Sequence, residues 1–158
     1  GSDPSRSKTD VNQIIDDVVE YFQRRLPRHS NQVKITVNHG NLPEIIANRE
    51  LLQWVLENLV RNSLDAMDKP SGIIGVKSEY EGQRNQIVIK YHDNGKGIQR
   101  GNQKKIFQPG MTTKKHGWGM GLALVKRIIE EYHKGQIKLI KSDSQGTQFN
   151  ISLPVGAK

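Results

Sequence analysis

The chain has 158 residues, and its 24 Lys and Arg against 16 Asp and Glu give a formal net charge of +8. This length fits one domain with a sizeable core. The charge suits an anionic ligand, nucleic acid or an acidic lipid surface. No basic stretch is interleaved with aromatic residues, which makes nucleic acid the less favoured partner, and the absence of cysteine excludes disulfides, Cys-based zinc sites and thiol nucleophiles.

The N-terminal part of the chain predicts a helix and two strands. We interpret residues 1–8 as a cloning remnant and an N-terminal extension, and residues 9–155 as one domain. Thr9 and Asp10 are a plausible helix start, and the apolar residues that follow recur at helical spacing until Pro27 ends the helix. Residues 33–37 alternate between apolar and polar side chains and predict a strand, and residues 44–47 predict a short one.

The rest of the chain predicts two helices and four strands. A helix capped by Asn48 should span residues 49–67, and another should span residues 120–132 and end at Lys134 and Gly135. Strands are expected at residues 73–80, 86–91, 136–141 and 147–153. Residues 98–118 show little periodicity and form a segment that is long for a loop in a compact domain. The interleaved elements predict an α/β two-layer sandwich: a mixed sheet of five or six strands with three helices on one face.

Four polar residues follow one edge of the apolar face of the second helix. Asn58, Asn62, Asp65 and Lys69 are spaced i, i+4, i+7 and i+11 and fall on one narrow stripe at helical periodicity, although Lys69 can lie past the helix end. Such a stripe is also typical of a solvated helix face. Asn is a poor helix former, so two Asn residues on one face favour a site. An Asn oxygen suits Mg²⁺ held together with phosphates and water.

Two glycine-containing stretches could hold a nucleotide. Asp93 follows a strand and precedes Asn94-Gly-Lys-Gly97, where the carboxylate could accept a hydrogen bond from an amino group such as that of adenine. Gly117, Gly119 and Gly121 alternate before a helix, a pattern that suits anion binding by backbone N–H groups. Alone, the alternating glycines are equally typical of a flexible surface loop, and residues 93–97 are more typical of an ordinary turn. Neither matches the P-loop or the dinucleotide-binding fingerprint.

The order of the motifs resembles the catalytic and ATP-binding domain of two-component sensor histidine kinases. Residues 58–66 resemble the N box of that family, residues 93–97 the G1 box, residues 106–114 the F box and residues 117–122 the G2 box. The resemblance covers about residues 9–155. The wider group is the GHKL ATPases, which include DNA gyrase, MutL and the heat-shock chaperones, and it implies the Bergerat fold.

The resemblance also implies roles for the matching residues. Asn62 would bind Mg²⁺, Asn58 would support the phosphate or metal site, and Asp93 would hold the adenine amino group of ATP. The segment from Gly101 to His116 would be a mobile ATP lid with Phe107 as its apolar anchor. The other residues implied in nucleotide binding are Gly95, Gly97, Ile98, Thr112, Thr113, Gly117, Gly119, Met120, Gly121, Leu122 and Thr147.

Two positions depart from the family pattern. Many histidine kinases have a Lys three residues after the second Asn of the N box, where this chain has Asp65. We therefore expect Lys114 or Lys115 to supply the cation that faces the phosphates, with Lys69 as the second choice. GHKL members that hydrolyse ATP efficiently have a Glu where this chain has Asn58, so we expect weak water activation.

The chain has no His-Glu or His-Asp dipeptide of the kind that surrounds the phosphoacceptor histidine of this family, and its five histidines are expected in loops or on the surface. The resemblance thus implies an isolated, monomeric kinase domain that faces the cytoplasm, whether or not the parent protein is membrane-anchored. Its partners would be ATP, a separate histidine-bearing dimerisation domain and, indirectly, a response regulator, without nucleic acid or direct membrane contact. The alternatives are an ATP-driven clamp, as in gyrase or chaperones, and a non-catalytic basic binding module.

Overall fold

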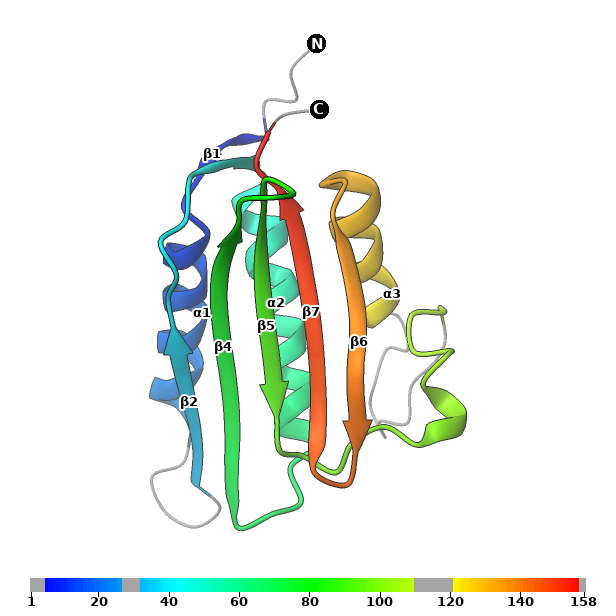
Figure 1. Ribbon diagram of the computed structural model, residues 1–158. Helices are drawn as coiled ribbons and strands as arrows, with labels where there is room; N and C mark the ends of the chain where they lie inside the picture. Colours follow the sequence, from blue (N-terminus) through cyan, green and yellow to red (C-terminus); the bar gives the residue numbers. More distant parts are fainter. Residues whose placement is uncertain (1–4, 27–31, 110–120, 157–158) are drawn as a thin grey trace.

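A computed structural model describes residues 5–26, 32–109 and 121–156. Its larger sheet forms one layer and the helices pack on one face of it, with both chain ends at the same end of the molecule (Figure 1). The elements, in chain order, are β1 (Ser7–Thr9), α1 (Val11–Arg25), β2 (Gln32–Asn38), β3 (Ile45–Ala47), α2 (Arg49–Asp65), β4 (Ser71–Glu81), β5 (Gln86–Asp93), the 3₁₀ turn η1 (Arg100–Asn102), α3 (Gly121–Lys126), the π-helix η2 (Arg127–Tyr132), β6 (Gln136–Asp143) and β7 (Gly146–Pro154).

The larger sheet has five strands in the order β2-β4-β5-β7-β6. β2 and β4 run parallel, and the other neighbouring pairs are antiparallel. The predicted α/β sandwich, with a mixed sheet and helices on one face, is therefore confirmed. The pairing between β5 and β7 places Thr147 opposite Asp93, at the end of the sheet away from the chain termini.

The short strand expected at residues 44–47 does not join the larger sheet. β3 lies outside the larger sheet and pairs antiparallel with β1, with Ser7 opposite Ala47. Residues 7 and 8, which we assigned to an extension that precedes the domain, are thus part of the fold. Arg6 strengthens this attachment, because its guanidinium donates to the carbonyl oxygens of Ile46 (3.1 Å) and Tyr132 (3.4 Å). β3 was expected as a strand at residues 44–47, whereas β1 was not expected, because three residues are too few to show a periodic pattern.

The first two helices begin where their capping residues predict. The side chain of Asp10 accepts a hydrogen bond from the backbone N–H of Gln13, and that of Asn48 accepts one from Leu51. α2 ends at Asp65, two residues earlier than expected. The N–H of Ala66 is shared between the carbonyls of Asn62 and Ser63 (both 3.1 Å), and the carbonyl of Ala66 accepts from Lys96 N (2.8 Å) in the loop after β5 instead of continuing the helix.

The third helix changes its winding, which the sequence did not predict. Its described part starts as α-helix at Gly121 and continues as π-helix from Arg127. His133, expected in a loop or on the surface, is only 2% exposed. Its Nε2 accepts a hydrogen bond from Asn48 N (3.1 Å), so its protonated Nδ1 donates to Ile128 O (2.8 Å). His133 thereby connects the end of η2 to the start of α2.

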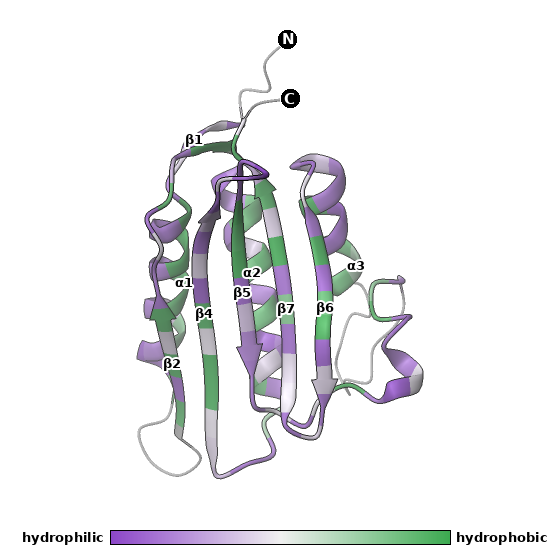
Figure 2. Cartoon of the chain, viewed as in Figure 1, coloured by the Kyte–Doolittle hydropathy of each residue, from purple (hydrophilic) through white to green (hydrophobic). Residues whose placement is uncertain are grey.

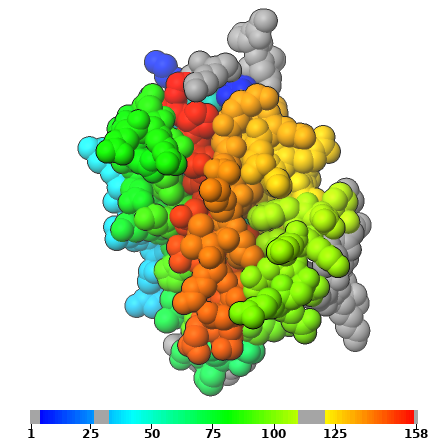
Figure 3. All heavy atoms as spheres, turned by 45° about the vertical axis from the view of Figure 1, so that its right-hand side comes forward, coloured from blue at the N-terminus to red at the C-terminus, as the bar shows by residue number. Residues whose placement is uncertain are grey.

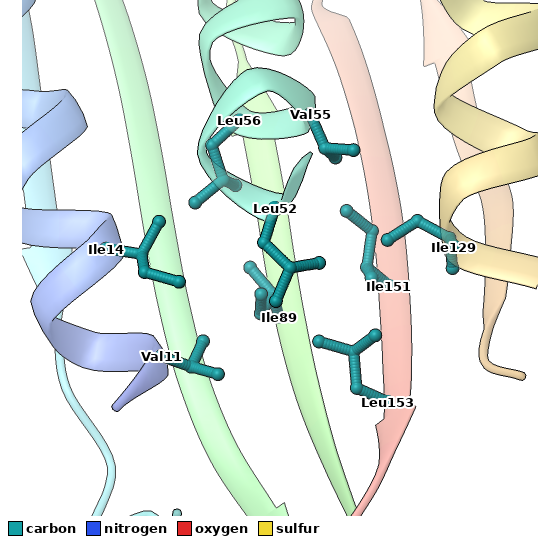
Figure 4. A pocket seen from close by; sticks show the side chains of 9 residues that line it. All are labelled: Val11, Ile14, Leu52, Val55, Leu56, Ile89, Ile129, Ile151 and Leu153. Atoms are coloured by element: carbon teal, nitrogen blue, oxygen red, sulfur yellow. The ribbon is translucent and has the colours of Figure 1, made fainter. Parts of the chain in front are cut away.

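The core lies between the helices and the sheet. Hydropathy alternates along the strands and divides each helix into an apolar and a polar side (Figure 2), as expected for two packed layers. Side chains from both layers meet around a small void (Figure 4), which is lined by Val11, Ile14, Leu52, Val55, Leu56, Ile89, Ile129, Ile151 and Leu153. Within the described ranges, no helix is long and apolar enough to cross a membrane.

Candidate nucleotide-binding site

The polar edge of α2 carries the two asparagines that the sequence singled out. Asn62 Nδ2 donates a hydrogen bond to Asn58 Oδ1 over 3.3 Å, so their proximity is confirmed. Gly121, at the start of the described part of α3, packs against the same amide, and a Cβ at Gly121 would lie 2.9 Å from Asn58 Oδ1. Three of the expected site residues, from two helices, therefore meet at one place.

A buried hydrogen-bond chain fixes the Asp93 carboxylate. Ser63 Oγ donates to Asp93 Oδ2 over 2.5 Å, and Ser63 and Asp93 are 2% and 9% exposed. Tyr91 OH lies 2.7 Å from Ser63 Oγ and 3.0 Å from the carbonyl oxygen of Leu59, to which it can donate. Because the Ser63 proton points to the carboxylate, Tyr91 is the donor to Ser63, and it shares its single proton between Ser63 Oγ and the Leu59 carbonyl. The other carboxylate oxygen, Oδ1, accepts from Gly95 N (2.8 Å).

Tyr91 stays protonated in this chain. Burial raises the pKa of its phenol strongly, and the negative charge of Asp93 raises it further. The phenol therefore remains a donor across the physiological pH range. The orientation of Asp93 is thus set by neutral donors whose protonation does not change.

The loop after Asp93 is held close to α2 and to the β6–β7 turn. Lys96 N donates to the carbonyl of Ala66, and a Cβ at Gly95 would lie 2.8 Å from the same oxygen. Gly97 has a φ of +81°, and a Cβ there would lie 2.1 Å from Asp143 O. Both the backbone angle and the close approach require glycine at residue 97.

The β6–β7 turn closes the other side of this loop. Ser142 Oγ lies 2.8 Å from Thr147 Oγ1 and accepts from Ile98 N over 2.8 Å, so Thr147 and Ile98 share one partner beside Asp93. Gly146 has a φ of +134°, and a Cβ there would lie 1.9 Å from the carbonyl oxygen of Asp93. The turn and the Asp93 loop therefore fit together only because of these glycines.

The start of the expected lid is anchored to the domain. Phe107 packs edge-on against Phe149 of β7 with ring centroids 6.2 Å apart, and Lys126 Nζ lies 5.5 Å from the centroid of the Phe107 ring. Ile106 beside it is 7% exposed. The segment up to residue 109 lies against β6 (Figure 3). Phe107 therefore makes the expected apolar contact, and Leu122 also packs against the core.

Several expected site residues lie outside the described residues, namely Thr112, Thr113, Lys114, Lys115, Gly117, Gly119 and Met120. Lys69, the second candidate for a phosphate-facing cation, lies just after α2 and is engaged by the backbone. Its ammonium group donates to the backbone carbonyls of Asn94 (2.7 Å), Gly95 (3.2 Å) and Ser144 (3.0 Å). Asn94 and Gly95 directly follow Asp93 in the chain, and Ser144 belongs to the β6–β7 turn, so Lys69 contacts both segments.

The donor set suits a magnesium ion shared with phosphates. Among the described residues, no group of three or more His, Cys, Asp or Glu side chains could hold a metal by itself. Asn58 and Asn62 offer two neutral amide side chains in contact with each other, and the hydrogen bond between them uses the Asn62 nitrogen, not the Asn62 oxygen. Amide oxygens fit an ion that takes only one or two ligands from protein and the rest from phosphate and water.

Sequence reasoning missed Ser63, Tyr91, Ser142 and the role of Lys69. Two of them had a visible signal. Ser63 lies four residues after Leu59 and is therefore a polar residue on the buried side of α2. Tyr91 lies two residues before Asp93 in β5, so the two side chains point to the same face of the sheet. Ser142 and Lys69 gave no signal, because their partners come from distant parts of the chain.

Comparisons with known proteins agree with this arrangement. The family described as histidine kinase-, DNA gyrase B- and HSP90-like ATPase matches residues 47–157. The sensor protein TdiS of Thauera aromatica is 30% identical over 96% of this chain and 28% of its own length. For the sensor histidine kinase ZraS of Escherichia coli K12, the identity is 34%, over 92% of this chain and 30% of ZraS. The catalytic domain of histidine kinase ThkA superposes with a TM-score of 0.81 at 26% identity, and 95% of each chain is covered.

Proposed function

The chain belongs to the histidine kinase-, DNA gyrase B- and HSP90-like ATPase family, and from this we propose that it binds Mg-ATP and transfers the γ-phosphoryl group to a histidine on a separate dimerisation domain. It spans about 30% of the length of the relatives TdiS and ZraS. The activity of a whole sensor kinase is therefore part of the proposal. The observation that carries it is the fixed, nearly buried carboxylate of Asp93 beside the asparagine pair of α2.

Asp93 would accept a hydrogen bond from the exocyclic amine of adenine. Its two oxygens already accept from Ser63 Oγ and Gly95 N, yet each carboxylate oxygen has two lone pairs. The amine can therefore bind without displacing either partner. Gly97, Ile98 and Thr147 lie around Asp93 and would line the base pocket.

The phosphates would extend from the base toward Asn58 and Asn62. Mg²⁺, when bound, neutralises charge on the triphosphate and orients the γ-phosphoryl group. Asn62 would contribute an oxygen ligand, and Asn58 would hold the Asn62 amide in place through their hydrogen bond. Lys114 or Lys115 would supply the additional positive charge. Catalysis on this surface is a matter of positioning and charge neutralisation.

The acceptor histidine would come from another domain. Asn58 stands where strongly hydrolysing relatives have a glutamate, and an amide cannot take a proton from water. Weak ATP hydrolysis suits a domain that would transfer the γ-phosphoryl group of ATP to a histidine, from which it would pass to a response regulator. ThkA has been solved in complex with the response regulator protein TrrA, which supports a response regulator as a partner of the parent protein.

Calorimetric binding of a non-hydrolysable ATP analogue tests the proposal. The unaltered chain should bind the analogue, with higher affinity in the presence of Mg²⁺, and Asp93→Ala should abolish binding. Asn62→Ala should retain binding of the base but lose the Mg²⁺ dependence. Lys138→Met is the matched control, because Lys138 is an exposed residue of β6 outside the site.

The outcomes separate the possible functions. An unaltered chain that binds no adenine nucleotide would refute the proposal and favour a basic binding module without catalysis. Sustained ATP turnover by the isolated chain would favour an ATP-driven clamp. Binding with very slow turnover, together with phosphoryl transfer to an added histidine-bearing dimerisation domain, is the expected result.

A further inference from the structure

Lys69 lies just after α2, at a point where three segments meet. Its Nζ donates to Asn94 O and Gly95 O of the loop after β5, and to Ser144 O of the β6–β7 turn. It also lies 3.3 Å from the carboxylate of the neighbouring Asp68. Its side chain is 32% exposed. The ammonium group thus joins the end of α2, the Asp93 loop and the β6–β7 turn.

An ammonium group is well suited to this position. It has three N–H donors and carries its charge at one point, and here it meets three carbonyl oxygens from two loops. The side chain of Asn94 is already engaged, because its Oδ1 accepts from Ile73 N (2.7 Å) and its Nδ2 donates to Ser71 O (3.0 Å). The backbone carbonyls of Asn94 and Gly95 accept from Lys69.

These carbonyls belong to the loop that orients Asp93. Gly95 N donates to Asp93 Oδ1, and the carbonyl of the same residue accepts from Lys69. On the opposite side, Gly146 of the β6–β7 turn packs against the carbonyl of Asp93. Lys69 therefore connects both segments that contact the backbone around Asp93.

We propose that Lys69 is a positioning residue that holds the Asp93 loop against the β6–β7 turn, and that it thereby determines affinity and selectivity for the base of the nucleotide. Lys69 does not touch the nucleotide. The nucleotide part of the inference rests on the proposed function, whereas the effect on the loop does not. Lys69→Met removes the donors while retaining much of the apolar side chain, and Lys138→Met removes the same charge from an exposed position on β6.

Hydrogen exchange without nucleotide tests the effect on the loop. The amide protons of Gly95 and Lys96 are hydrogen-bonded, to Asp93 Oδ1 and Ala66 O. In Lys69→Met they should exchange roughly tenfold faster, which corresponds to about 1.4 kcal/mol of lost local stability. Amides in the middle of β5 should be unchanged, and Lys138→Met should match the unaltered chain. Unchanged exchange at Gly95 and Lys96 in Lys69→Met would overturn the proposal.

Calorimetry with adenosine, AMP, ADP, ATP and GTP tests the effect on binding. Lys69→Met should weaken binding of the four adenine ligands by a similar factor, roughly tenfold. It should also reduce the ratio of the affinity for ATP to the affinity for GTP. A loss that grows with the number of phosphates would place Lys69 on the phosphates and overturn the proposal. Equal nucleotide affinities for Lys69→Met and the unaltered chain would also overturn the proposal. Binding of no nucleotide by the unaltered chain, with faster exchange in Lys69→Met, would refute the nucleotide function alone and leave Lys69 as a residue that positions the loop.

Discussion

Ser63→Ala should reveal how strongly the fold depends on the buried chain from Tyr91 to Asp93. Ser63 is the central member, because its hydroxyl accepts from Tyr91 and donates to Asp93. Alanine removes both hydrogen bonds and leaves Asp93 Oδ2 without this donor in a place where Asp93 is 9% exposed. The tyrosine retains an acceptor in the carbonyl of Leu59.

The expected magnitude follows from the charge on Asp93. A hydrogen bond to a charged group contributes about 1.5–3 kcal/mol, against roughly 1 kcal/mol for one between neutral groups. The better helix propensity of alanine offsets part of the loss, by about 0.5 kcal/mol. We therefore expect Ser63→Ala to lower the free energy of unfolding by about 1–2.5 kcal/mol. Tyr91→Phe removes only neutral hydrogen bonds and should cost about 1 kcal/mol.

Urea unfolding followed by circular dichroism measures these differences, provided that the transition is two-state. Ser144→Ala, in the exposed β6–β7 turn, is the control and should change the free energy by less than about 0.5 kcal/mol. The double variant should cost less than the sum of the two single variants, because both side chains belong to one chain of hydrogen bonds. A Tyr91→Phe variant that is clearly more destabilised than Ser63→Ala, or strict additivity, would refute the reasoning.

Two further predictions concern the Asp93 loop and the end of η2. Gly146→Ala should lower the free energy of unfolding in urea by about 2 kcal/mol or more, because residue 146 has a φ of +134° and a Cβ would lie 1.9 Å from Asp93 O. Gly101→Ala is the control: a Cβ there would meet open space, so the free energy of unfolding should not change. Burial lowers the pKa of His133 from its ordinary 6.5 in the folded protein, so below about pH 6.5 the unfolded chain binds the additional proton. Stability should then fall with decreasing pH by up to about 1.4 kcal/mol per pH unit. A His133→Gln variant should lose this dependence in unfolding curves between pH 7 and 5, and an unchanged slope would show that other groups cause it.

The sequence alone determined the class of the fold and the place of its motifs. Helical spacing and capping residues located α1 and α2, alternation located β2, and runs of strand-forming residues bounded by turn residues located the other strands of the larger sheet, because these signals are local. The pairing of Asn58 with Asn62 followed from their i, i+4 spacing on a helix. The order of the four boxes indicated the family, which the comparisons confirmed.

Only the tertiary structure decided which distant groups meet. The hydrogen bonds that join Tyr91 to Ser63 and Ser63 to Asp93 form only because β5 packs against α2. Lys69 lies on the helical stripe of Asn58 and Asn62, yet α2 ends before it, and its ammonium group turns to carbonyls up to 75 residues away in sequence. His133 is buried because Asn48, 85 residues earlier, supplies a donor to its ring. Contacts of this kind depend on how the layers pack, and a local pattern does not encode that.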